Sequence, residues 1–205
     1  MTKVVCLCSG GLDSTTLVYW LVNEGFVVQP LFFNYGQHCA DKEWSAVWQL
    51  LNKKRSVLTP VRKNISDIFC ESKSRLIHEP DLWSENVTAE DLFLPYRTLV
   101  LFSLGAAVAQ IYESKSVYAG FINSNYAKEA DCTSVFLNSL EQLAQGLGDL
   151  EVRMPFREWS KNEVARLGAQ LGVPVASTFS CQIYSDVPCG VCPNCVDRQE
   201  ALSRL

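Results

Sequence analysis

The sequence predicts an α/β protein in which a doubly wound parallel sheet carries a small cysteine-rich unit at its C-terminal end. Three observations predict this class. Strand-like and helix-like segments alternate along most of the 205 residues, two adjacent glycines join the first strand to the first helix, and four of the nine cysteines lie in the last 25 residues. Such alternation favours parallel strands connected by helical crossovers.

The first part of the chain contains five expected elements. The apolar run Lys3–Cys8 predicts a buried strand, because a Ser-Gly-Gly turn follows it directly. Apolar residues at helical spacing predict a helix over Leu12–Asn23, and the β-rich run Phe26–Tyr35 predicts the second strand. A second helix is expected over Ala40–Asn52 and a short third strand over Arg55–Thr59.

The second part begins with an irregular, charged segment, Ile65–Leu94, for which we expect a short helix and a mobile connection over a site. Tyr96–Tyr112 predicts a strongly apolar helix, and Lys115–Phe121 predicts another strand. Amphipathic spacing predicts two further helices, over Val135–Leu147 and Lys161–Leu171, and the second ends before a glycine and a proline.

Composition and charge restrict the function. The chain is 48% apolar and 20% charged, which is typical of a globular protein and disfavours disorder. Its 18 basic and 22 acidic residues give a net charge of −4, so no strong nucleic-acid-binding surface is expected. The longest apolar stretch, Leu99–Ile111, is too short to span a membrane, and the N-terminus lacks a signal-peptide pattern. We therefore expect a cytoplasmic protein that acts on a small molecule.

The turn after the first strand has the residue types of a phosphate-binding loop. Adjacent glycines allow close backbone approach, and the following helix N-terminus offers unpaired N–H groups to phosphate oxygens. Hydroxyl groups add donors, and Asp13 is a candidate ligand for a Mg²⁺ ion that bridges phosphates. The spacing fits neither a Walker motif nor a dinucleotide-binding glycine motif. The alternative is an ordinary turn in which Asp13 and Ser14 only cap the helix. The expected nucleotide-binding residues are Ser9, Gly10, Gly11, Asp13, Ser14 and Thr15.

The sequence of residues 9–15, Ser-Gly-Gly-Leu-Asp-Ser-Thr, resembles the pyrophosphatase-loop signature of the ATP-pyrophosphatase superfamily. The resemblance implies an adenine-nucleotide α-hydrolase-like fold, and an enzyme that cleaves ATP between the α and β phosphates. It further implies that a carbonyl or carboxylate oxygen becomes adenylated while pyrophosphate leaves.

We divide the chain into a main domain, residues 1–177, and a C-terminal unit, residues 178–205. An odd number of cysteines without a secretion signal argues against a disulfide framework. Four cysteines in the C-terminal unit have the spacing of a closed tetrahedral zinc site with a structural role. An iron–sulfur cluster is the chemical alternative, and a redox dithiol or unliganded core cysteines are less compatible with four clustered thiols. The expected metal ligands are Cys181, Cys189, Cys192 and Cys195.

The loop and the cysteine motif together resemble the 7-cyano-7-deazaguanine synthase family of queuosine precursor biosynthesis, over nearly the whole chain. The resemblance implies a C–N ligase that uses ATP and ammonia to convert 7-carboxy-7-deazaguanine to an amide and then to a nitrile. It implies one zinc ion held by the four cysteines, and ATP with Mg²⁺ as the other cofactors. A homodimer is compatible with the sequence, and the oligomeric state is left open.

The resemblance also implies site residues. Arg97 would bind the substrate carboxylate or a phosphate, and Lys161 would neutralise charge on pyrophosphate; an exposed arginine and an ordinary helix lysine are the alternatives. Asp131 would accept hydrogen bonds from the guanidine-like edge of the deazaguanine, although it could instead cap the following helix. Gln37 and His38 would line the pocket, with a solvent-facing histidine as the alternative.

One segment departs from the family pattern. Asn125 stands where the pattern has an aspartate, and residues 128–130 replace a Gly-Tyr-Pro sequence. The departure keeps two alternative functions open: transfer of the activated acyl group to another amine, for example on a protein in antiviral defence, and tRNA modification. A catalytically inactive scaffold is disfavoured by the intact phosphate loop.

Overall fold

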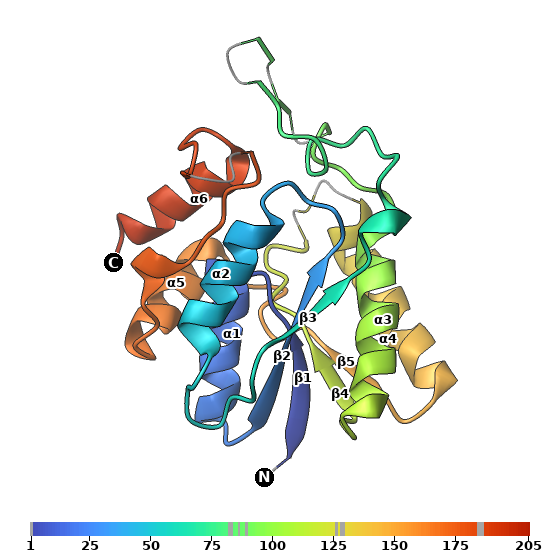
Figure 1. Ribbon diagram of the computed structural model, residues 1–205. Coiled ribbons are helices and arrows are strands. Elements are labelled where there is room, and N and C mark those ends of the chain that lie inside the picture. Colours follow the sequence, from blue (N-terminus) through green and yellow to red (C-terminus); the bar gives the residue numbers. More distant parts are fainter. Residues whose placement is uncertain are drawn as a thin grey trace.

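The parallel α/β architecture predicted from the sequence is confirmed by a computed structural model (Figure 1). The structure describes residues 2–81, 84–85, 87–88, 90–125, 127, 130–183 and 187–205. All pairs in its five-stranded sheet are parallel, in the order β3-β2-β1-β4-β5. The strands are β1 (Lys3–Leu7), β2 (Val27–Asn34), β3 (Val61–Asn64), β4 (Ser116–Tyr118) and β5 (Glu151–Arg153).

Helices cover both faces of the sheet. They are α1 (Leu12–Asn23), α2 (Ala40–Leu51), α3 (Arg97–Ile111), α4 (Ser134–Leu147), α5 (Lys161–Gln170) and α6 (Pro193–Leu202). A hydrophobic core lies on each face of the sheet, and alternate residues of β1 point into the two cores. Val4 packs in the cluster that contains residues of α1 and α2, and Val5 packs in the cluster that contains residues of α3 and α4. This alternation follows from the two-residue period of a strand. No helix among the described residues is long and apolar enough to cross a membrane.

Two expectations for the strands were wrong or incomplete. The third strand is not Arg55–Thr59 but Val61–Asn64, and Val57 forms only an isolated bridge to Val28. Pro60, which has no backbone N–H to donate, separates the two segments. The sequence also gave no signal for β5, whose three residues include a single buried one, Val152.

The order of the strands positions a site. The chain leaves β1 toward β2 on one side, and β4 pairs with β1 on the other side, so the crossover direction reverses between β1 and β4. In open parallel sheets, ligands bind at the carboxyl ends of the strands beside such a reversal. The turn that follows β1 and the residues after β4 meet at this point.

Gly10 holds that turn against α2. Its φ is +75°, and a Cβ atom would lie 2.7 Å from the backbone oxygen of Glu43 and 2.9 Å from Ala46 Cβ. We expect Gly10→Ala to lower the free energy of unfolding by about 2–5 kcal/mol, the sum of left-handed strain and overpacking. Gly25 is the control, because its φ is +87° but no atom lies within 4 Å of the added Cβ. Gly25→Ala should cost only about 1–2 kcal/mol, and equal losses in urea denaturation would contradict the packing argument.

Candidate active site

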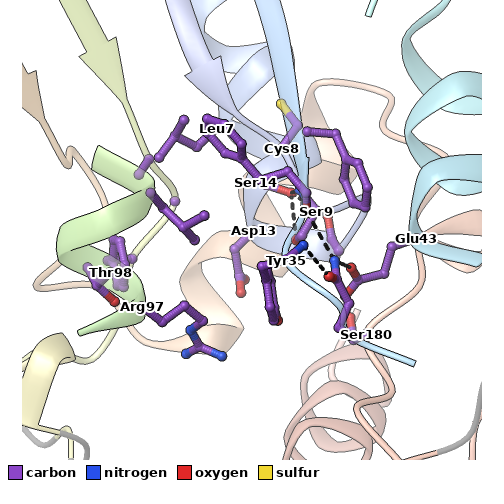
Figure 2. Close-up of a pocket in the computed structure, with 18 of the residues that line it drawn as sticks. Leu7, Cys8, Ser9, Asp13, Ser14, Tyr35, Glu43, Arg97, Thr98 and Ser180 are labelled. Atoms are coloured by element: carbon purple, nitrogen blue, oxygen red, sulfur yellow. Dashed lines mark hydrogen bonds between the residues drawn. The ribbon is translucent and has the colours of Figure 1, made fainter. Parts of the chain in front are cut away.

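A cavity of about 320 Å³ opens at the carboxyl ends of β1, β2 and β4 (Figure 2). Helix α3 closes one side, and the segment around Ser180 closes another. The cavity brings together residues that lie more than 150 positions apart in the chain. The predicted site residues that line it are Ser9, Gly11, Asp13, Ser14, Gln37, Arg97 and Lys161.

The turn after β1 has the form of an anion-binding loop. The Ser9 backbone N–H donates to Ser14 Oγ over 3.2 Å, and the Ser14 hydroxyl donates to the Gly11 carbonyl over 3.4 Å. Gly11 occupies the N-cap of α1 without a side-chain cap, so the first-turn N–H groups have no side-chain acceptor there. Gly10 and Thr15, which we predicted together with these residues, lie outside the cavity lining. Thr15 is 1% exposed.

Asp13 and Lys161 form an ion pair at the base of the cavity. Lys161 Nζ lies 2.6 Å from Asp13 Oδ2, and both side chains are largely buried. The second oxygen, Oδ1, is buried and has no hydrogen-bond partner among the described residues. Gly120, just after β4, approaches so closely that a Cβ would lie 3.0 Å from the backbone carbon of Asp13. The pair therefore offers a phosphate an ammonium group, and offers a cation a carboxylate oxygen.

Arg97 is the first residue of α3 and lies beside the ring of Tyr35. Its guanidinium carbon is 5.8 Å from the ring centroid, within the range of a cation–π contact. Burial disfavours the charged form of Arg97, but attraction to Tyr35 and Asp131 raises its pKa above the ordinary value. Arg97 is therefore a half-buried, permanent positive charge at the cavity wall, which excludes the alternative of an exposed surface arginine.

Asp131 acts on α3. It lies in the short 3₁₀ turn Ala130–Cys132, is 4% exposed, and its Oδ2 accepts a hydrogen bond from the Thr98 backbone N–H over 3.1 Å. This contact satisfies a free donor in the first turn of α3, beside Arg97. The alternative that Asp131 caps the following helix is wrong, because Thr133 is the N-cap of α4. Asp131 is not among the residues that line the cavity.

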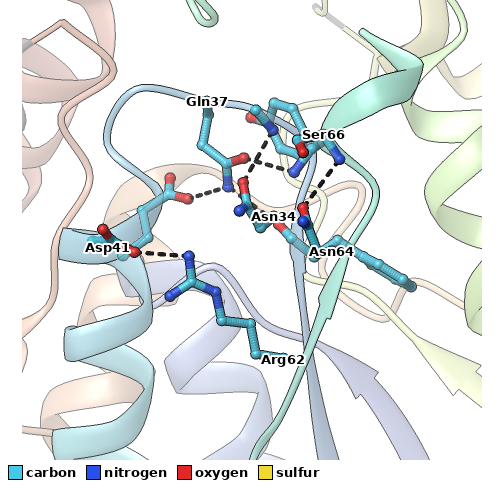
Figure 3. A network of polar contacts seen from close by, with 10 residues as sticks. Asn34, Gln37, Asp41, Arg62, Asn64 and Ser66 are labelled. Atoms are coloured by element: carbon cyan, nitrogen blue, oxygen red, sulfur yellow. Dashed lines mark hydrogen bonds and ion pairs between the residues drawn. The ribbon is translucent and has the colours of Figure 1, made fainter. Parts of the chain in front are cut away.

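Gln37 and His38 follow β2, in the loop that leads to α2. Figure 3 shows the contacts of Gln37 in this loop. Gln37 Oε1 accepts from the Tyr35 backbone N–H over 2.9 Å, and Gln37 Nε2 donates to the Phe33 carbonyl over 3.1 Å and to Glu43 Oε2 over 2.9 Å. His38 Nε2 lies 3.1 Å from the Gln182 carbonyl oxygen, and His38 does not line the cavity. Gln37 therefore orients the Glu43 side chain in the cavity. His38 connects the loop to the C-terminal unit through its contact with Gln182.

Glu43 is a cavity residue that sequence reasoning missed. It lies in the first turn of α2, and its carboxylate reaches the cavity. Burial raises the pKa of Glu43 to about 7, although hydrogen bonds from Gln37 and Cys39 oppose the shift. In the sequence it looks like an ordinary acidic residue at a helix N-terminus, and only the fold of the preceding loop places it at the site.

The four cysteines of the C-terminal unit gather as the sequence predicted. The Sγ atoms of Cys181, Cys189, Cys192 and Cys195 all lie within 4.8 Å of one another. Zn–S bonds of about 2.3 Å in a tetrahedron place sulfur atoms about 3.8 Å apart, so the cluster fits zinc after a small contraction. Backbone N–H groups of residues 189 and 192 donate to sulfur over 3.4 and 3.3 Å, which stabilises thiolates. Without a metal, burial raises the pKa of Cys195 to about 11.

The cysteine cluster is joined to the turn after β1. The Phe179 backbone N–H donates to the Gly10 carbonyl over 2.9 Å, and Ser180 and Gln182 line the cavity. From α6, Arg198 donates to the Thr178 hydroxyl. In Figure 1, α6 lies beside α5, whose first residue is Lys161. The C-terminal unit therefore forms one wall of the cavity.

Comparison with known proteins decides the family. The family model described as "Queuosine biosynthesis protein QueC" matches residues 3–205. The chain belongs to the QueC family. One relative, the 7-cyano-7-deazaguanine synthase 1 of Desulfitobacterium hafniense, is 32% identical over 98% of this chain and 91% of its own. The 7-cyano-7-deazaguanine synthase of Archaeoglobus fulgidus is 34% identical over 97% of this chain and 85% of its own.

Solved structures outside the QueC family share the fold. A 4-thiouridine synthetase in complex with RNA and ATP superposes with a TM-score of 0.57 at 18% identity, over 99% of this chain and 50% of that one. The NMN synthetase of Francisella tularensis superposes with a TM-score of 0.50 at 17% identity, over 98% of this chain and 84% of that one. The expectation of an ATP-pyrophosphatase type of fold for this QueC member is therefore confirmed.

The segment that departs from the family pattern is described only in part. Lys128 and Glu129 lie outside the described residues. Asn125, which replaces an aspartate of the pattern, is exposed and accepts a hydrogen bond from Ser134 Oγ over 2.7 Å. Its side chain also donates to Glu158. These contacts fasten the residues before α4 to the loop that precedes α5.

Proposed function

We propose that the chain is an ATP-dependent ligase that converts 7-carboxy-7-deazaguanine to the amide and then to 7-cyano-7-deazaguanine, with ammonia as the amine. The observation that carries the proposal is the largely buried Asp13–Lys161 pair beside the uncapped N-terminus of α1, within one cavity with Arg97. A phosphate-binding end and a carboxylate-binding cation in one cavity are what carboxylate adenylation requires.

The two ends of the cavity suggest where ATP lies. Leu7, Phe33, Leu101 and Phe102 form an apolar part that suits the flat adenine ring. Ser9, Ser14 and the first N–H groups of α1 then face the triphosphate, with Lys161 neutralising the pyrophosphate. A Mg²⁺ ion held by Asp13 would supply charge neutralisation between phosphates.

In the first step, a carboxylate oxygen held by Arg97 attacks the α phosphorus, and the bond to the β-phosphate oxygen breaks as pyrophosphate leaves. Ammonia then attacks the acyl carbon, AMP and one nitrogen-bound proton leave, and the amide forms. In the second round the amide oxygen attacks the α phosphorus of another ATP. Loss of AMP and of two nitrogen-bound protons gives the nitrile. The four cysteines would hold a structural zinc ion, because four protein ligands leave no open position.

Product analysis tests this proposal. The chain is mixed with ATP, Mg²⁺, ammonium and 7-carboxy-7-deazaguanine, and the bases are identified by mass spectrometry. The expected product is one water lighter than the amide. A reaction that stops at the amide, or a base attached to another amine supplied in the mixture, would contradict the assigned product while leaving carboxylate activation intact.

A further inference from the structure

Two opposite charges lie on either side of the Tyr35 ring in the cavity. Arg97 comes from the start of α3 and Glu43 from the first turn of α2, and both line the cavity (Figure 2). They are close enough for the guanidinium charge to act on the Glu43 carboxylate and oppose the rise of its pKa. The cavity therefore has a cationic end, an aromatic surface and an anionic end.

Glu43 is held in place and keeps acceptor capacity. Gln37 Nε2 donates to its Oε2 over 2.9 Å, and the Cys39 thiol is its other hydrogen-bonding partner among the described residues. Gln37 is itself fixed by the backbone of Tyr35 and Phe33. A carboxylate accepts about four hydrogen bonds, so about two acceptor positions are available to a ligand.

Among the described residues, no other carboxylate offers the same position. Among the described lining residues, the only other one is Asp13, which is paired with Lys161 at the phosphate end. Asp131, the residue that the sequence suggests for the base, instead accepts from the Thr98 backbone N–H outside the cavity lining.

We propose that Glu43 is the residue that recognises the base, accepting hydrogen bonds from the N1–H and 2-amino groups of the deazaguanine while Arg97 binds its 7-carboxylate. This inference rests on the proposed function. The substrate carries an anion at one end and two parallel N–H donors at the opposite end, with a flat ring between them. That order matches Arg97, Tyr35 and Glu43, and two parallel donors fit a carboxylate in a bidentate manner. Gln37 is then a positioning residue, because it orients Glu43.

The test compares two ligands by calorimetry: 7-carboxy-7-deazaguanine and the analogue without the 2-amino group, 7-carboxy-7-deazahypoxanthine. The native chain should prefer the first by at least about tenfold, because the analogue leaves a buried acceptor unpaired. In Glu43→Gln the preference should shrink to within about threefold, because the amide presents only one acceptor oxygen, which Gln37 already occupies. Glu43→Asp is the second variant. It keeps the negative charge, but its shorter side chain places the carboxylate farther from the ligand, so it should also lose the preference.

Asp131→Asn is the matched control, since it changes the other candidate carboxylate. It should keep the native preference for the 2-amino compound even where thermal unfolding shows a less stable α3. The inference is overturned if Glu43→Gln or Glu43→Asp, folded by the same criterion, keeps the native preference, or if Asp131→Asn loses it. A native chain that binds neither ligand overturns the proposed function and the inference with it, whereas binding with an unchanged preference in the Glu43 variants overturns the inference alone.

Discussion

Lys161→Ala is expected to slow the ATP-dependent release of pyrophosphate by about 10²–10³-fold, the effect of removing one preorganised group that stabilises transition-state charge. In the native chain Lys161 Nζ lies 2.6 Å from Asp13 Oδ2, inside the cavity and beside the N-terminus of α1. In the proposed function the lysine neutralises developing charge on pyrophosphate, and in the structure it pairs with the Asp13 carboxylate. Its loss would leave the largely buried Asp13 carboxylate without its partner, and the proposed phosphate site with one positive charge fewer.

Asp13→Asn and Ser14→Ala should have losses of the same order, for different reasons. The amide removes the charge that a Mg²⁺ ligand needs, and the alanine removes the hydroxyl that accepts from the Ser9 backbone N–H. Lys115→Ala is the control, because Lys115 forms an exposed pair with Asp149 at 3.9 Å. Pyrophosphate release is measured with saturating ATP and 7-carboxy-7-deazaguanine. Native rates in Lys161→Ala or in Asp13→Asn would rule out the assignment of the phosphate end.

Cys192→Ser is expected to remove the bound metal and to weaken both the C-terminal unit and the active site. Structural zinc sites contribute on the order of 10 kcal/mol of apparent binding free energy to folding, so a lost thiolate is costly. The cluster is also part of the main core: Cys181, Cys192 and Cys195 are buried together with residues of β1 and α1. The hydrogen bond from the Phe179 backbone N–H to the Gly10 carbonyl connects the C-terminal unit to the turn after β1. Loss of the metal should therefore also disturb this turn.

Elemental analysis and thermal unfolding measure this effect. The native chain should contain about one zinc ion, as a four-thiolate site implies, and the variant should contain almost none and unfold at a lower temperature. Cys70→Ser is the control, because Cys70 is exposed and lies outside the four-cysteine cluster. Iron with visible absorbance in the native chain, or a metal-free native chain of unchanged stability, would refute the zinc assignment.

Much of the fold could be predicted because its signals are local. The apolar run before Ser9, the helical spacing after Gly11 and the cysteine spacing each act over a few residues, and each led to the element or cluster that the structure contains. The third strand was misplaced because Val61–Asn64 is short and half exposed, with no two-residue pattern of burial. Strand β5 has only Val152 buried, which leaves too little pattern to detect.

The candidate site was predictable where chemistry follows from a motif and less so where it depends on tertiary packing. Asp13 and Lys161 are 148 positions apart, and although both were named as site residues, nothing in the sequence indicated that they form an ion pair. Glu43 gave no signal, because an acidic residue in the first turn of a helix is ordinary. Its position depends on Gln37, whose side-chain contacts fold the loop between β2 and α2. Asp131 was indicated for the base by the resemblance alone, whereas its contact with the α3 N-terminus follows from the packing of α3 against the 3₁₀ turn.

Isotope transfer tests the central claim, activation of a carboxylate by adenylation in this cavity, most directly. The native chain is given ATP, Mg²⁺, ammonium and 7-carboxy-7-deazaguanine labelled with oxygen-18 in its carboxylate, and the nucleotide products are separated and weighed by mass spectrometry. The account predicts that AMP carries oxygen-18 and that pyrophosphate carries none, because the carboxylate oxygen attacks the α phosphorus and leaves with AMP. Label in inorganic phosphate together with ADP, or AMP formed without label, would contradict it.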